Sequence, residues 1–291
     1  MSPNAIEKID LHMHTCASDG TDTPAEIISH VREEGIQLFS VTDHDTVRGC
    51  CEVINKRAEG DPHFFSGVEF SCKDGGGKYH ILGYGYDVNA EGIQRLVKTT
   101  HELRMEKVRE RIRALTEEYG FHFPAGELQE LFSHDEPGKP HIGNMMTRLG
   151  YTKSKDEAIY DFLNKIKVKS RYIRPEDAIQ GILESGGIPI LAHPVYGSGE
   201  ELYLGEEMEQ RLRHLLEQGI QGVEAYYSGF TKPMQDLMLD LADKYRLYVT
   251  AGSDYHGRNK LVLLGDTNLE SVSEAHPGLH RFLHAVSEKI Y

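Results

Sequence analysis

The sequence lacks several features that would assign it to other classes of protein. It has no run of about 18 consecutive apolar residues, so we expect no transmembrane helix and no membrane partner. Its first residues, Met1 to Lys8, lack the charged start and apolar stretch of a secretory signal. Only four cysteines occur and none forms a CxxC pair, which argues against a disulfide framework. We therefore expect a cytoplasmic protein.

Basic side chains are outnumbered by acidic ones. Lys and Arg total 32 against 46 Asp and Glu, and the formal net charge is −14. Such a surface repels nucleic-acid phosphates, so we expect no duplex nucleic acid as a partner. The charge still permits a small phosphorylated substrate, such as a nucleotide or a short oligonucleotide, held by metal ions inside a pocket.

Seven short apolar runs predict β-strands. They cover residues 9–14, 38–41, 64–70, 79–86, 188–191, 223–227 and 247–251. Helical patterns lie between most of these runs, and one begins at Thr23-Pro24, where a capping residue precedes a proline. Strand–helix alternation favours an α/β fold with a parallel sheet, and polar residues at strand ends favour a barrel with its site on that rim.

One long stretch breaks this alternation. Residues 92–170 show no strong strand pattern and are mostly helical by period, including a charged segment over 102–119. We interpret this stretch as a helical insertion that forms a lid domain. The barrel domain would then consist of residues 1–91 and 171–291, which suits one barrel plus an insertion.

The positions of the histidines indicate a metal site. His12 and His14 are two positions apart, so on a strand their imidazoles lie on the same face. Further imidazoles and carboxylates lie near other predicted strands, and the full set is His12, His14, Asp19, His44, Glu69, His80, His193, Asp254 and His256. Burying so many ionisable groups costs free energy unless they coordinate cations. Nitrogen and carboxylate donors without thiolates suit Zn, Mn or Fe.

The segments that carry these residues resemble the motifs of the PHP (polymerase and histidinol phosphatase) family of metal-dependent phosphoesterases. The matching segments are Asp10-Leu-His-Met-His-Thr, Ser18-Asp-Gly, Val41-Thr-Asp-His-Asp-Thr, Gly67-Val-Glu, Leu191-Ala-His-Pro and Gly252-Ser-Asp-Tyr-His. The resemblance covers residues 8–90 and 175–265. It implies a distorted (β/α)7 TIM-like barrel, and the insertion is similar to the subgroup that includes 3′,5′-nucleoside bisphosphate phosphatases.

The resemblance also implies how the nine residues would share two to three divalent metal ions. The ligands implied for a first metal are His12, His14, Glu69 and Asp254. Those implied for a second are a bridging Glu69, His80 and His193. Those implied for a third are Asp19, His44 and His256. The catalytic residues would be Glu69, Asp254 and His256, and two flanking carboxylates, Asp43 and Asp45, would orient the imidazoles.

Residues that would contact the substrate are less constrained. Two candidates lie in the insertion and two follow the last ligand motif: His141, Arg148, Arg258 and Lys260. Arg171 and Tyr172 are further options. Some relatives carry an arginine after the His193-Pro194 pair, where this chain has Val195-Tyr196-Gly197, and this departure weakens the transfer of a particular substrate from them.

The leading functional hypothesis is a phosphoesterase for a small phosphorylated metabolite, in which a metal-bridging hydroxide attacks phosphorus. A 3′,5′-nucleoside bisphosphate is the first candidate substrate because of the insertion, followed by histidinol phosphate and a cyclic sugar phosphodiester. An amidohydrolase-type C–N hydrolase is the alternative class, although a bridging Glu69 in place of a lysine favours the phosphoesterase. A non-catalytic regulatory module is disfavoured by the complete ligand set.

Overall fold

The computed structural model describes residues 6–134, 137–169, 171–198 and 201–291. The chain forms two compact units. The first, called the sheet unit below, comprises Met1–Val97 and Ile173–Tyr291, and the second, called the helical unit, comprises Lys98–Tyr172. Within the described residues, every helix is too short or too polar to cross a lipid bilayer.

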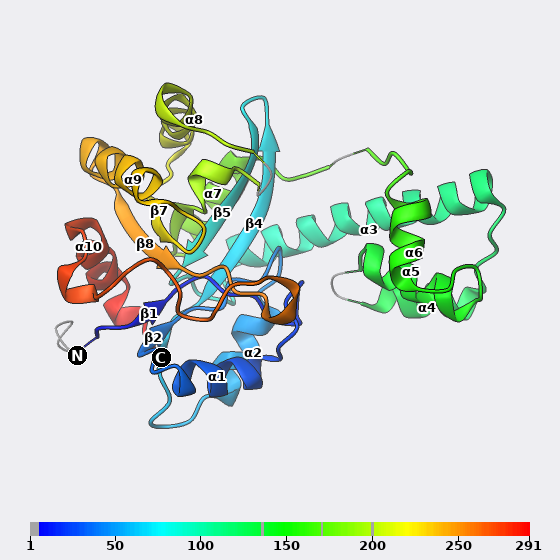
Figure 1. Cartoon of the computed structure of the whole chain (residues 1–291), viewed down its shortest axis with the longest axis horizontal. Coiled ribbons are helices and arrows are strands. Elements are labelled where there is room, and N and C mark those ends of the chain that lie inside the picture. The colour runs from blue at the N-terminus through cyan, green and yellow to red at the C-terminus, as the bar shows by residue number, and fades with distance from the viewer. Residues whose placement is uncertain (1–5, 135–136, 170, 199–200) are drawn as a thin grey trace. The chain divides into compact units, whose positions relative to one another are not determined.

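Two sheets form the centre of the sheet unit (Figure 1). Three parallel strands make the first: β1 (Ile9–Asp10), β2 (Leu38–Phe39) and β3 (His63–Phe64). Five strands, hydrogen-bonded in chain order, make the second: β4 (Gly67–Asp74), β5 (Gly77–Tyr84), β6 (Ile188–Leu191), β7 (Gly222–Tyr227) and β8 (Tyr248–Gly252). The fold is mixed α/β, and the run predicted as one strand over 64–70 is split into β3 and β4.

The expectation of a wholly parallel sheet is wrong at β5, which runs antiparallel to both β4 and β6. A glycine-rich turn joins β4 to β5, and Gly77 has a φ of 120°, which only glycine adopts without strain. Because Ile81 of β5 pairs with Leu191, the last residue of β6, the first half of β5 extends past the carboxyl end of β6. His80 therefore lies near the predicted rim although it is close to the start of its own strand.

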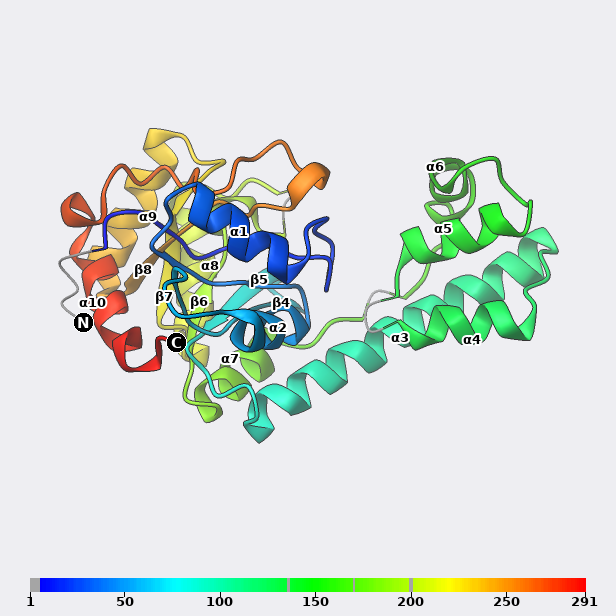
Figure 2. The same cartoon turned by 90° about the horizontal axis from the view of Figure 1, so that it is seen from below.

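Six helices flank these strands: α1 (Pro24–Glu33), α2 (Arg48–Lys56), α7 (Pro175–Glu184), α8 (Gly205–Gln218), α9 (Lys232–Tyr245) and α10 (Pro277–Val286). In the five-stranded sheet, α7 packs against β4, β5 and β6, while α9 contacts β7 and β8. Figure 2 shows α10 beside β8, which it contacts. Short helical turns complete the unit: η3 (Pro194–Tyr196), η4 (Gly257–Asn259), η5 (Val272–Glu274) and η6 (Ser287–Lys289).

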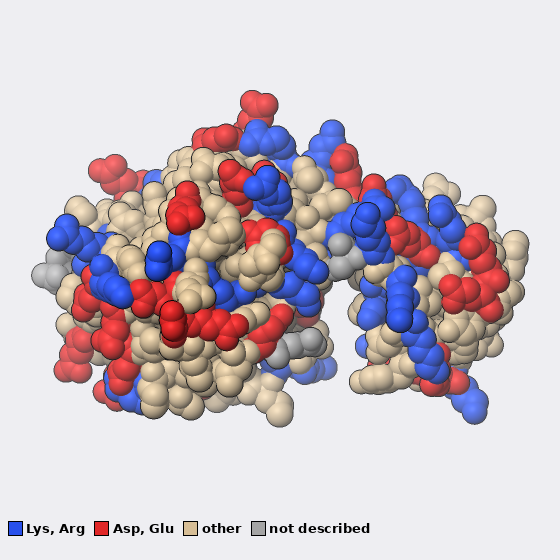
Figure 3. Space-filling model, turned by 90° about the horizontal axis from the view of Figure 1, so that it is seen from above, with Lys and Arg blue, Asp and Glu red and all other residues tan. Residues whose placement is uncertain are grey.

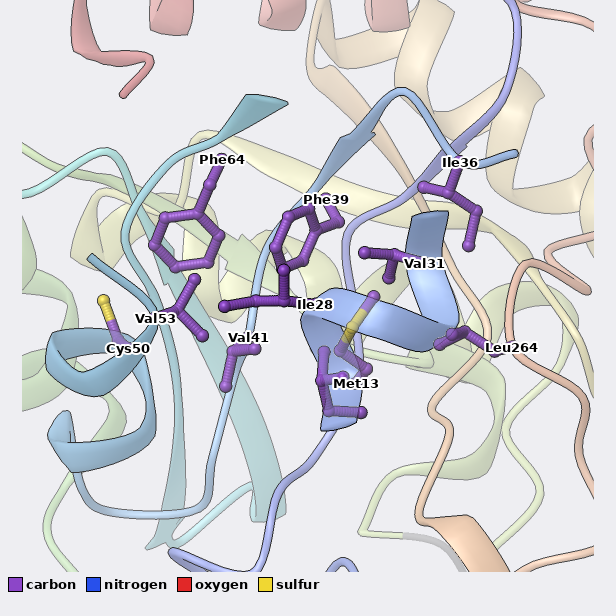
Figure 4. Close-up of a cluster of buried hydrophobic side chains, with 11 residues drawn as sticks. Met13, Ile28, Val31, Ile36, Phe39, Val41, Cys50, Val53, Phe64 and Leu264 are labelled. Atoms are coloured by element: carbon purple, nitrogen blue, oxygen red, sulfur yellow. The ribbon is translucent and has the colours of Figure 1, made fainter. Parts of the chain in front are cut away.

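An apolar core joins α1 and α2 to the three-stranded sheet (Figure 4). It includes Val31 of α1, Val53 of α2, Phe39 of β2 and Phe64 of β3, all fully buried. The two phenylalanine ring centroids lie 5.0 Å apart. Burial of each such side chain contributes about 1.5 to 3 kcal/mol, so this core fixes the strands from which the site-bearing loops begin.

The start of α1 follows the predicted pattern. Thr23 Oγ1 accepts a hydrogen bond from the Glu26 backbone N–H at 3.2 Å, and Glu26 Oε2 accepts one from the Thr23 backbone N–H at 2.7 Å. Pro24 occupies the first turn. Such a cap is worth about 1 kcal/mol, and it confirms the helix start that the sequence predicted.

The helical unit contains most of α3 (Glu91–Tyr119), followed by α4 (Ala125–Ser133), α5 (Lys139–Arg148), α6 (Lys155–Glu157) and a π-helical segment η2 (Ala158–Leu163). Its described residues contain no strand. Leu115, Leu131, Ile142 and Met146 contribute to a separate apolar core, and none is more than 3% exposed. Helices close in sequence therefore bury one another within this unit.

Candidate metal centre

Backbone pairing beyond the regular strands connects the two sheets. Leu11 N–H donates to Ala251 O at 2.9 Å and Asp254 N–H donates to His12 O at 2.8 Å, so the segment after β1 lies along the end of β8. An isolated bridge pairs His44, which follows β2, with Glu69 in β4. These links bring donor side chains from both ends of the chain to one place.

Glu69 is fully buried at the centre of these side chains. Its Oε2 lies 3.2 Å from Nε2 of His12, 3.2 Å from Nε2 of His14 and 3.2 Å from Nδ1 of His44. Asp254 approaches the same two Nε2 atoms, with its Oδ1 at 3.6 Å from His12 and 3.3 Å from His14. Two carboxylates and two imidazoles thus converge in the arrangement implied for a first metal.

The other oxygen of Glu69 faces a different pair of imidazoles. Oε1 lies 3.0 Å from Nδ1 of His80 and 3.1 Å from Nε2 of His193, and these two nitrogens are 3.3 Å apart. One carboxylate therefore presents its two oxygens to two sets of ring nitrogens, which is the geometry that a bridging ligand requires.

A third set of donors gathers around Asp19, whose side chain is 55% exposed. Its Oδ1 lies 3.2 Å from Nε2 of His256 and 3.6 Å from Nδ1 of His14, and its Oδ2 lies 3.8 Å from Nε2 of His44. The structure thus brings Asp19, His44 and His256 together and adds His14 to them. His14 and His44 each direct one ring nitrogen toward Glu69 and the other toward Asp19.

The donor chemistry of this cluster fits divalent cations. Within the described residues, three sets of donor atoms lie within 4.8 Å of one another: His12, His14, Glu69 and Asp254; His44, Glu69 and His80; and His14, Asp19, His44 and His256. Nδ1 of His14, of His44 and of His193 is buried there without a hydrogen-bond partner. Unpartnered buried nitrogens cost free energy, whereas neutral imidazoles and carboxylates are good ligands for Zn, Mn and Fe.

The pKa values within the cluster are pushed apart. Burial alone would lower the pKa of His14, but Asp254, Glu69 and Asp19 outweigh burial and raise it to about 9. Burial prevails at His44 and lowers its pKa to about 3. Burial would raise the pKa of Glu69, but the surrounding imidazoles hold it well below its usual range. The pKa of Glu69 therefore keeps this carboxylate ionised among the surrounding imidazoles.

Glu224 of β7 supports the cluster and was not predicted from the sequence. Its Oε1 lies 2.9 Å from Nδ1 of His12, and its Oε2 accepts the His193 backbone N–H at 2.9 Å. Gly252 makes this approach possible, because a Cβ there would lie 2.2 Å from His12 Cβ and 2.5 Å from Glu224 Oε1. The available signal was a lone carboxylate inside the apolar run Val223–Tyr227.

Asp43 has a different role from the one expected. It accepts hydrogen bonds from the Thr15 N–H at 2.8 Å, the Thr15 hydroxyl at 2.8 Å and the Ser18 hydroxyl at 2.7 Å. Asp43 thereby holds the turn that leads into Asp19. Asp45 accepts the Ser71 backbone N–H at 3.0 Å. The carboxylate that orients an imidazole through its second nitrogen is Glu224, because Nδ1 of His12 faces it.

The second oxygen of Asp254 is engaged away from the imidazoles. Oδ2 accepts a hydrogen bond from the Tyr227 hydroxyl at 2.9 Å and from Lys260 Nζ at 2.6 Å. Burial raises the pKa of Tyr227, and the nearby Asp254 raises it further, so the phenol remains a neutral donor. The Lys260 side chain is 41% exposed while that of Asp254 is 5% exposed, so Lys260 links the buried cluster to solvent.

Three residues of the site have backbone conformations that favour glycine. Asp45, His193 and Asp254 have φ values of 58°, 27° and 60°. A residue with a Cβ costs about 1 to 2 kcal/mol in this region. The neighbouring strands hold these turns in place. At two of them, after β6 and β8, the side chains of His193 and Asp254 point into the cluster, while Asp45 accepts the Ser71 backbone N–H.

The predicted substrate-contact residues are spread over both units. In the sheet unit, Arg258 is exposed in η4 and its backbone N–H donates to Thr21 Oγ1 at 3.1 Å. In the helical unit, Arg148 pairs with Glu127 at 2.6 Å and with Glu130 at 3.1 Å. Arg171, His141 and Tyr172 also belong to the helical unit, where Arg171 is paired with Glu106 and Glu110 of α3.

Comparison with protein families agrees with this geometry. A family model described as the PHP domain matches residues 10–170, more than half of the chain. The chain belongs to the PHP domain family. This PHP protein is a hydrolase, namely a metal-dependent phosphoesterase.

Three curated relatives of the PHP protein align along most of its length. A phosphoribosyl 1,2-cyclic phosphate 1,2-diphosphodiesterase of Eggerthella lenta is 28% identical over 86% of this chain and 94% of its own. A 5′-3′ exoribonuclease of Haemophilus influenzae is 27% identical over 95% and 99%. A 3′,5′-nucleoside bisphosphate phosphatase of Chromobacterium violaceum is 27% identical over 86% and 88%.

Solved structures resemble the PHP protein over nearly the whole chain. A metal-dependent phosphoesterase of Bifidobacterium adolescentis superposes with a TM-score of 0.74 at 24% identity, covering 95% of this chain and 96% of its own. An amidohydrolase of Chromobacterium violaceum, with bound sulfate and no metal, superposes with a TM-score of 0.73 at 26% identity, covering 98% and 97%. The PHP protein thus shares the fold of both, insertion included.

Proposed function

We propose that the protein hydrolyses a phosphate monoester of a small nucleotide, with a 3′,5′-nucleoside bisphosphate as the first candidate substrate. The observation that carries the proposal is the position of Glu69, whose Oε2 faces His12, His14 and His44 while its Oε1 faces His80 and His193. The three relatives described above act on a cyclic phosphate, on RNA and on a nucleoside bisphosphate, so their substrates share a phosphoester bond next to a ribose.

Two to three divalent cations, of Mn, Fe or Zn, would be held by the nine donor residues. The first would take His12, His14, Glu69 and Asp254; the second Glu69, His80 and His193; and the third Asp19, His44 and His256. Bound there, cations supply positive charge for the phosphoryl oxygens and lower the pKa of water enough for it to attack phosphorus.

The protein's own side chains complete the site. Glu224 fixes the orientation of the His12 ring. Tyr227 and Lys260 both donate to Oδ2 of Asp254, so Oδ1 of Asp254 remains available to bind a metal ion. Lys260 also places an ammonium group at the solvent side of the cluster. This group can exchange its ion pair with Asp254 for one with a phosphate oxygen of the substrate. Arg258, exposed two residues earlier, is another candidate for a phosphate contact.

Phosphate release from a substrate panel tests the proposal. The Mn-loaded protein would be assayed with a 3′,5′-nucleoside bisphosphate, histidinol phosphate, a ribose cyclic phosphodiester and a 5′-phosphorylated trinucleotide, alongside metal counting. We expect the bisphosphate to give the highest kcat/KM and chelator-treated protein to be inactive. Highest activity on the trinucleotide would overturn the substrate assignment, and release of amine from amide substrates without any phosphate release would overturn the phosphomonoesterase itself.

A C–N hydrolase is the second candidate because a structural neighbour at 26% identity bears the name amidohydrolase. The same panel therefore includes amide substrates.

The acidic net charge of −14 favours small ligands over long RNA.

A further inference from the structure

Arg211 of α8 is a buried cation in the sheet unit. Many Lys and Arg side chains lie at the surface on the face drawn in Figure 3, whereas Arg211 is 8% exposed and is the one buried residue of these two types among those that the structure describes. No carboxylate in the described part of the chain forms an ion pair with it. Burial of an unpaired charge costs free energy, so other contacts compensate for it here.

The guanidinium group of Arg211 contacts the start of β5. Its Nη2 donates to the carbonyl oxygen of Lys78 at 2.7 Å, and its Nη1 donates to that of Gly76. Its Cζ lies 4.2 Å from the centroid of the Tyr79 ring, which is a cation–π contact. Arg211 thus holds the backbone and one side chain of the residues that directly precede His80.

A second aromatic ring connects Arg211 to the segment after β6. The centroid of the Tyr203 ring lies 3.8 Å from Cζ of Arg211. The backbone N–H of Tyr203 donates to the carbonyl oxygen of Val195 at 2.7 Å. Val195 lies in η3, two residues after His193. The same guanidinium therefore also holds the segment that directly follows His193.

The two segments that Arg211 contacts carry the imidazoles that face Oε1 of Glu69. Nδ1 of His80 and Nε2 of His193 lie 3.0 and 3.1 Å from this oxygen and 3.3 Å from each other. The Ala192 N–H donates to the His80 carbonyl at 3.0 Å, so the two segments are also joined by their backbones. Because His193 has a φ of 27°, its turn depends on its surroundings for support. Metal ligands must be held to within about 0.5 Å, and such support comes from groups outside the ligand set.

We propose that Arg211 is a positioning residue for the imidazole pair of His80 and His193. It holds the start of β5 on one side and the Tyr203 ring on the other, and so keeps the two imidazoles at the spacing that Oε1 of Glu69 requires. The inference rests on the proposed assignment of this pair to the second cation, and it adds the group that keeps the pair in place. Since Arg211 contacts the neighbours of this pair, we expect it to affect one cation site and to leave the others unchanged.

Binding of Mn²⁺ to the whole chain tests this role without an assay of turnover. The metal-free protein would be titrated with Mn²⁺, and the free ion would be measured by its EPR signal. Arg211→Met keeps an unbranched side chain but removes the charge and the donors. We expect it to weaken one Mn²⁺ site about 10- to 100-fold and to leave the affinity of the other sites unchanged. Unchanged affinity at every site would overturn the proposal.

A matched control comes from the same helix. Arg213→Met removes an exposed arginine two residues further along α8 and should leave every Mn²⁺ affinity unchanged. A loss in Arg213→Met equal to that in Arg211→Met would show an effect of charge on α8 rather than of position, and would overturn the proposal.

The variant His193→Ala identifies the affected site. It should remove the same Mn²⁺ site, and the addition of Arg211→Met should then cause no further loss, because both changes act on one site. A further loss at the remaining sites would show a general role of Arg211 in the fold and would overturn the proposal.

The same variants separate this inference from the proposed function. If His193→Ala binds as much Mn²⁺ as the unaltered protein, the assignment of His193 to the second cation is wrong and the inference is wrong with it. If His193→Ala loses a site and Arg211→Met loses none, the inference alone is wrong.

A second pair of variants provides the test if Arg211→Met does not fold. Tyr203 is half-buried, so its replacement disturbs the core less. Tyr203→Phe keeps the ring beside the guanidinium and should bind Mn²⁺ as the unaltered protein does. Tyr203→Ala removes the ring and should weaken the same site about 3- to 10-fold. Equal Mn²⁺ affinity in these two variants would overturn the proposal.

Discussion

The sheet unit and the helical unit bury different kinds of side chain. The sheet unit fully buries His12, His14, Glu69 and Glu224 beside its apolar residues, whereas the core of the helical unit is built from aliphatic and aromatic side chains. Apolar burial requires only complementary shape, but each buried polar group requires a partner of its own. The interior of the sheet unit therefore depends on specific polar contacts between particular residues. The interior of the helical unit depends on side chains that fill the available volume.

The two units also differ in the sequence distance between contacting residues. Glu224 meets His12 across 212 positions, and Ser253 donates to Asp10 across 243. The helical unit is one continuous stretch, Lys98–Tyr172. Contacts between residues distant in sequence form slowly because a long loop must close first. Formation of the metal centre thus requires two segments that are distant in sequence to come together. The helical unit can form from contacts between residues of one continuous segment.

The largest effect is expected at the centre of the polar interior. Glu69→Gln removes the charge that the two sets of imidazoles share, and we expect a loss of turnover of about 10³-fold or more, with fewer metals bound. Turnover by phosphate release and metal content by mass spectrometry would be measured together. Glu130→Gln, which removes an ion-paired carboxylate from the helical unit, should change neither. Near-native turnover of Glu69→Gln with full metal content would contradict the bridging role.

The corresponding test of the helical core is Ile142→Ala. Ile142 is fully buried, and the substitution should lower the free energy of unfolding by about 2 to 5 kcal/mol through lost burial and a cavity. Denaturant unfolding, with hydrogen exchange followed separately in Lys98–Tyr172, would locate the effect. Metal content should be unchanged. A loss of bound metal in this variant would mean that the two interiors are coupled rather than separate.

A smaller effect is expected at the solvent side of the metal centre. Lys260→Met keeps the aliphatic chain but removes the ammonium group, and kcat/KM should fall about tenfold through loss of a charged contact to the substrate. Metal stoichiometry should stay the same, because Lys260 Nζ bonds Oδ2 of Asp254 and not Oδ1, the oxygen that faces the imidazoles. Lys244→Met, which breaks an exposed pair with Glu209, is the control. An unchanged kcat/KM would remove Lys260 from the substrate site.

The smallest effect is expected for a polar contact of the sheet unit outside the metal centre. Burial would raise the pKa of Asp74, but hydrogen bonds from His214, the Gly76 N–H and Gln218 lower it. A carboxyl with a lowered pKa in the folded state stabilises the fold above its unfolded value of about 3.9, and this stabilisation is lost as the pH falls through the folded value.

Asp74→Asn should therefore cost up to about 1 kcal/mol at pH 7, and this cost should disappear as the pH falls through the lowered pKa of Asp74 in the folded state. Urea unfolding of both proteins across this range measures the difference. A cost that does not change with pH would show that the Asp74 charge contributes nothing to stability.

Local signals in the sequence predicted much of this architecture. The Thr23-Pro24 helix start is confirmed because a capping box is encoded within four residues. The nine donor residues could be named because each follows or interrupts a short apolar run, and the structure brings them together. The mixed α/β fold and the PHP family assignment are likewise confirmed.

Other features could not be predicted because they depend on distant partners. The direction of β5 is not visible in the periodicity, which is the same for parallel and antiparallel strands. Glu224 has a role only because His12 lies beside it, and Asp43 turned toward Thr15 and Ser18 instead of an imidazole. The Asp254 contacts to Tyr227 and Lys260 likewise follow from tertiary structure alone.

The left-handed backbone at Asp45, His193 and Asp254 has a consequence for protein engineering. Glycine would relieve the backbone strain at each position, so a selection for thermal stability alone, carried out without metal or substrate, would tend to discard these side chains. The same selection would leave the helical core intact, since its residues serve stability directly. Directed evolution of a more thermostable enzyme from this protein therefore requires activity to be measured in every round. Otherwise the evolved protein will be stable but inactive.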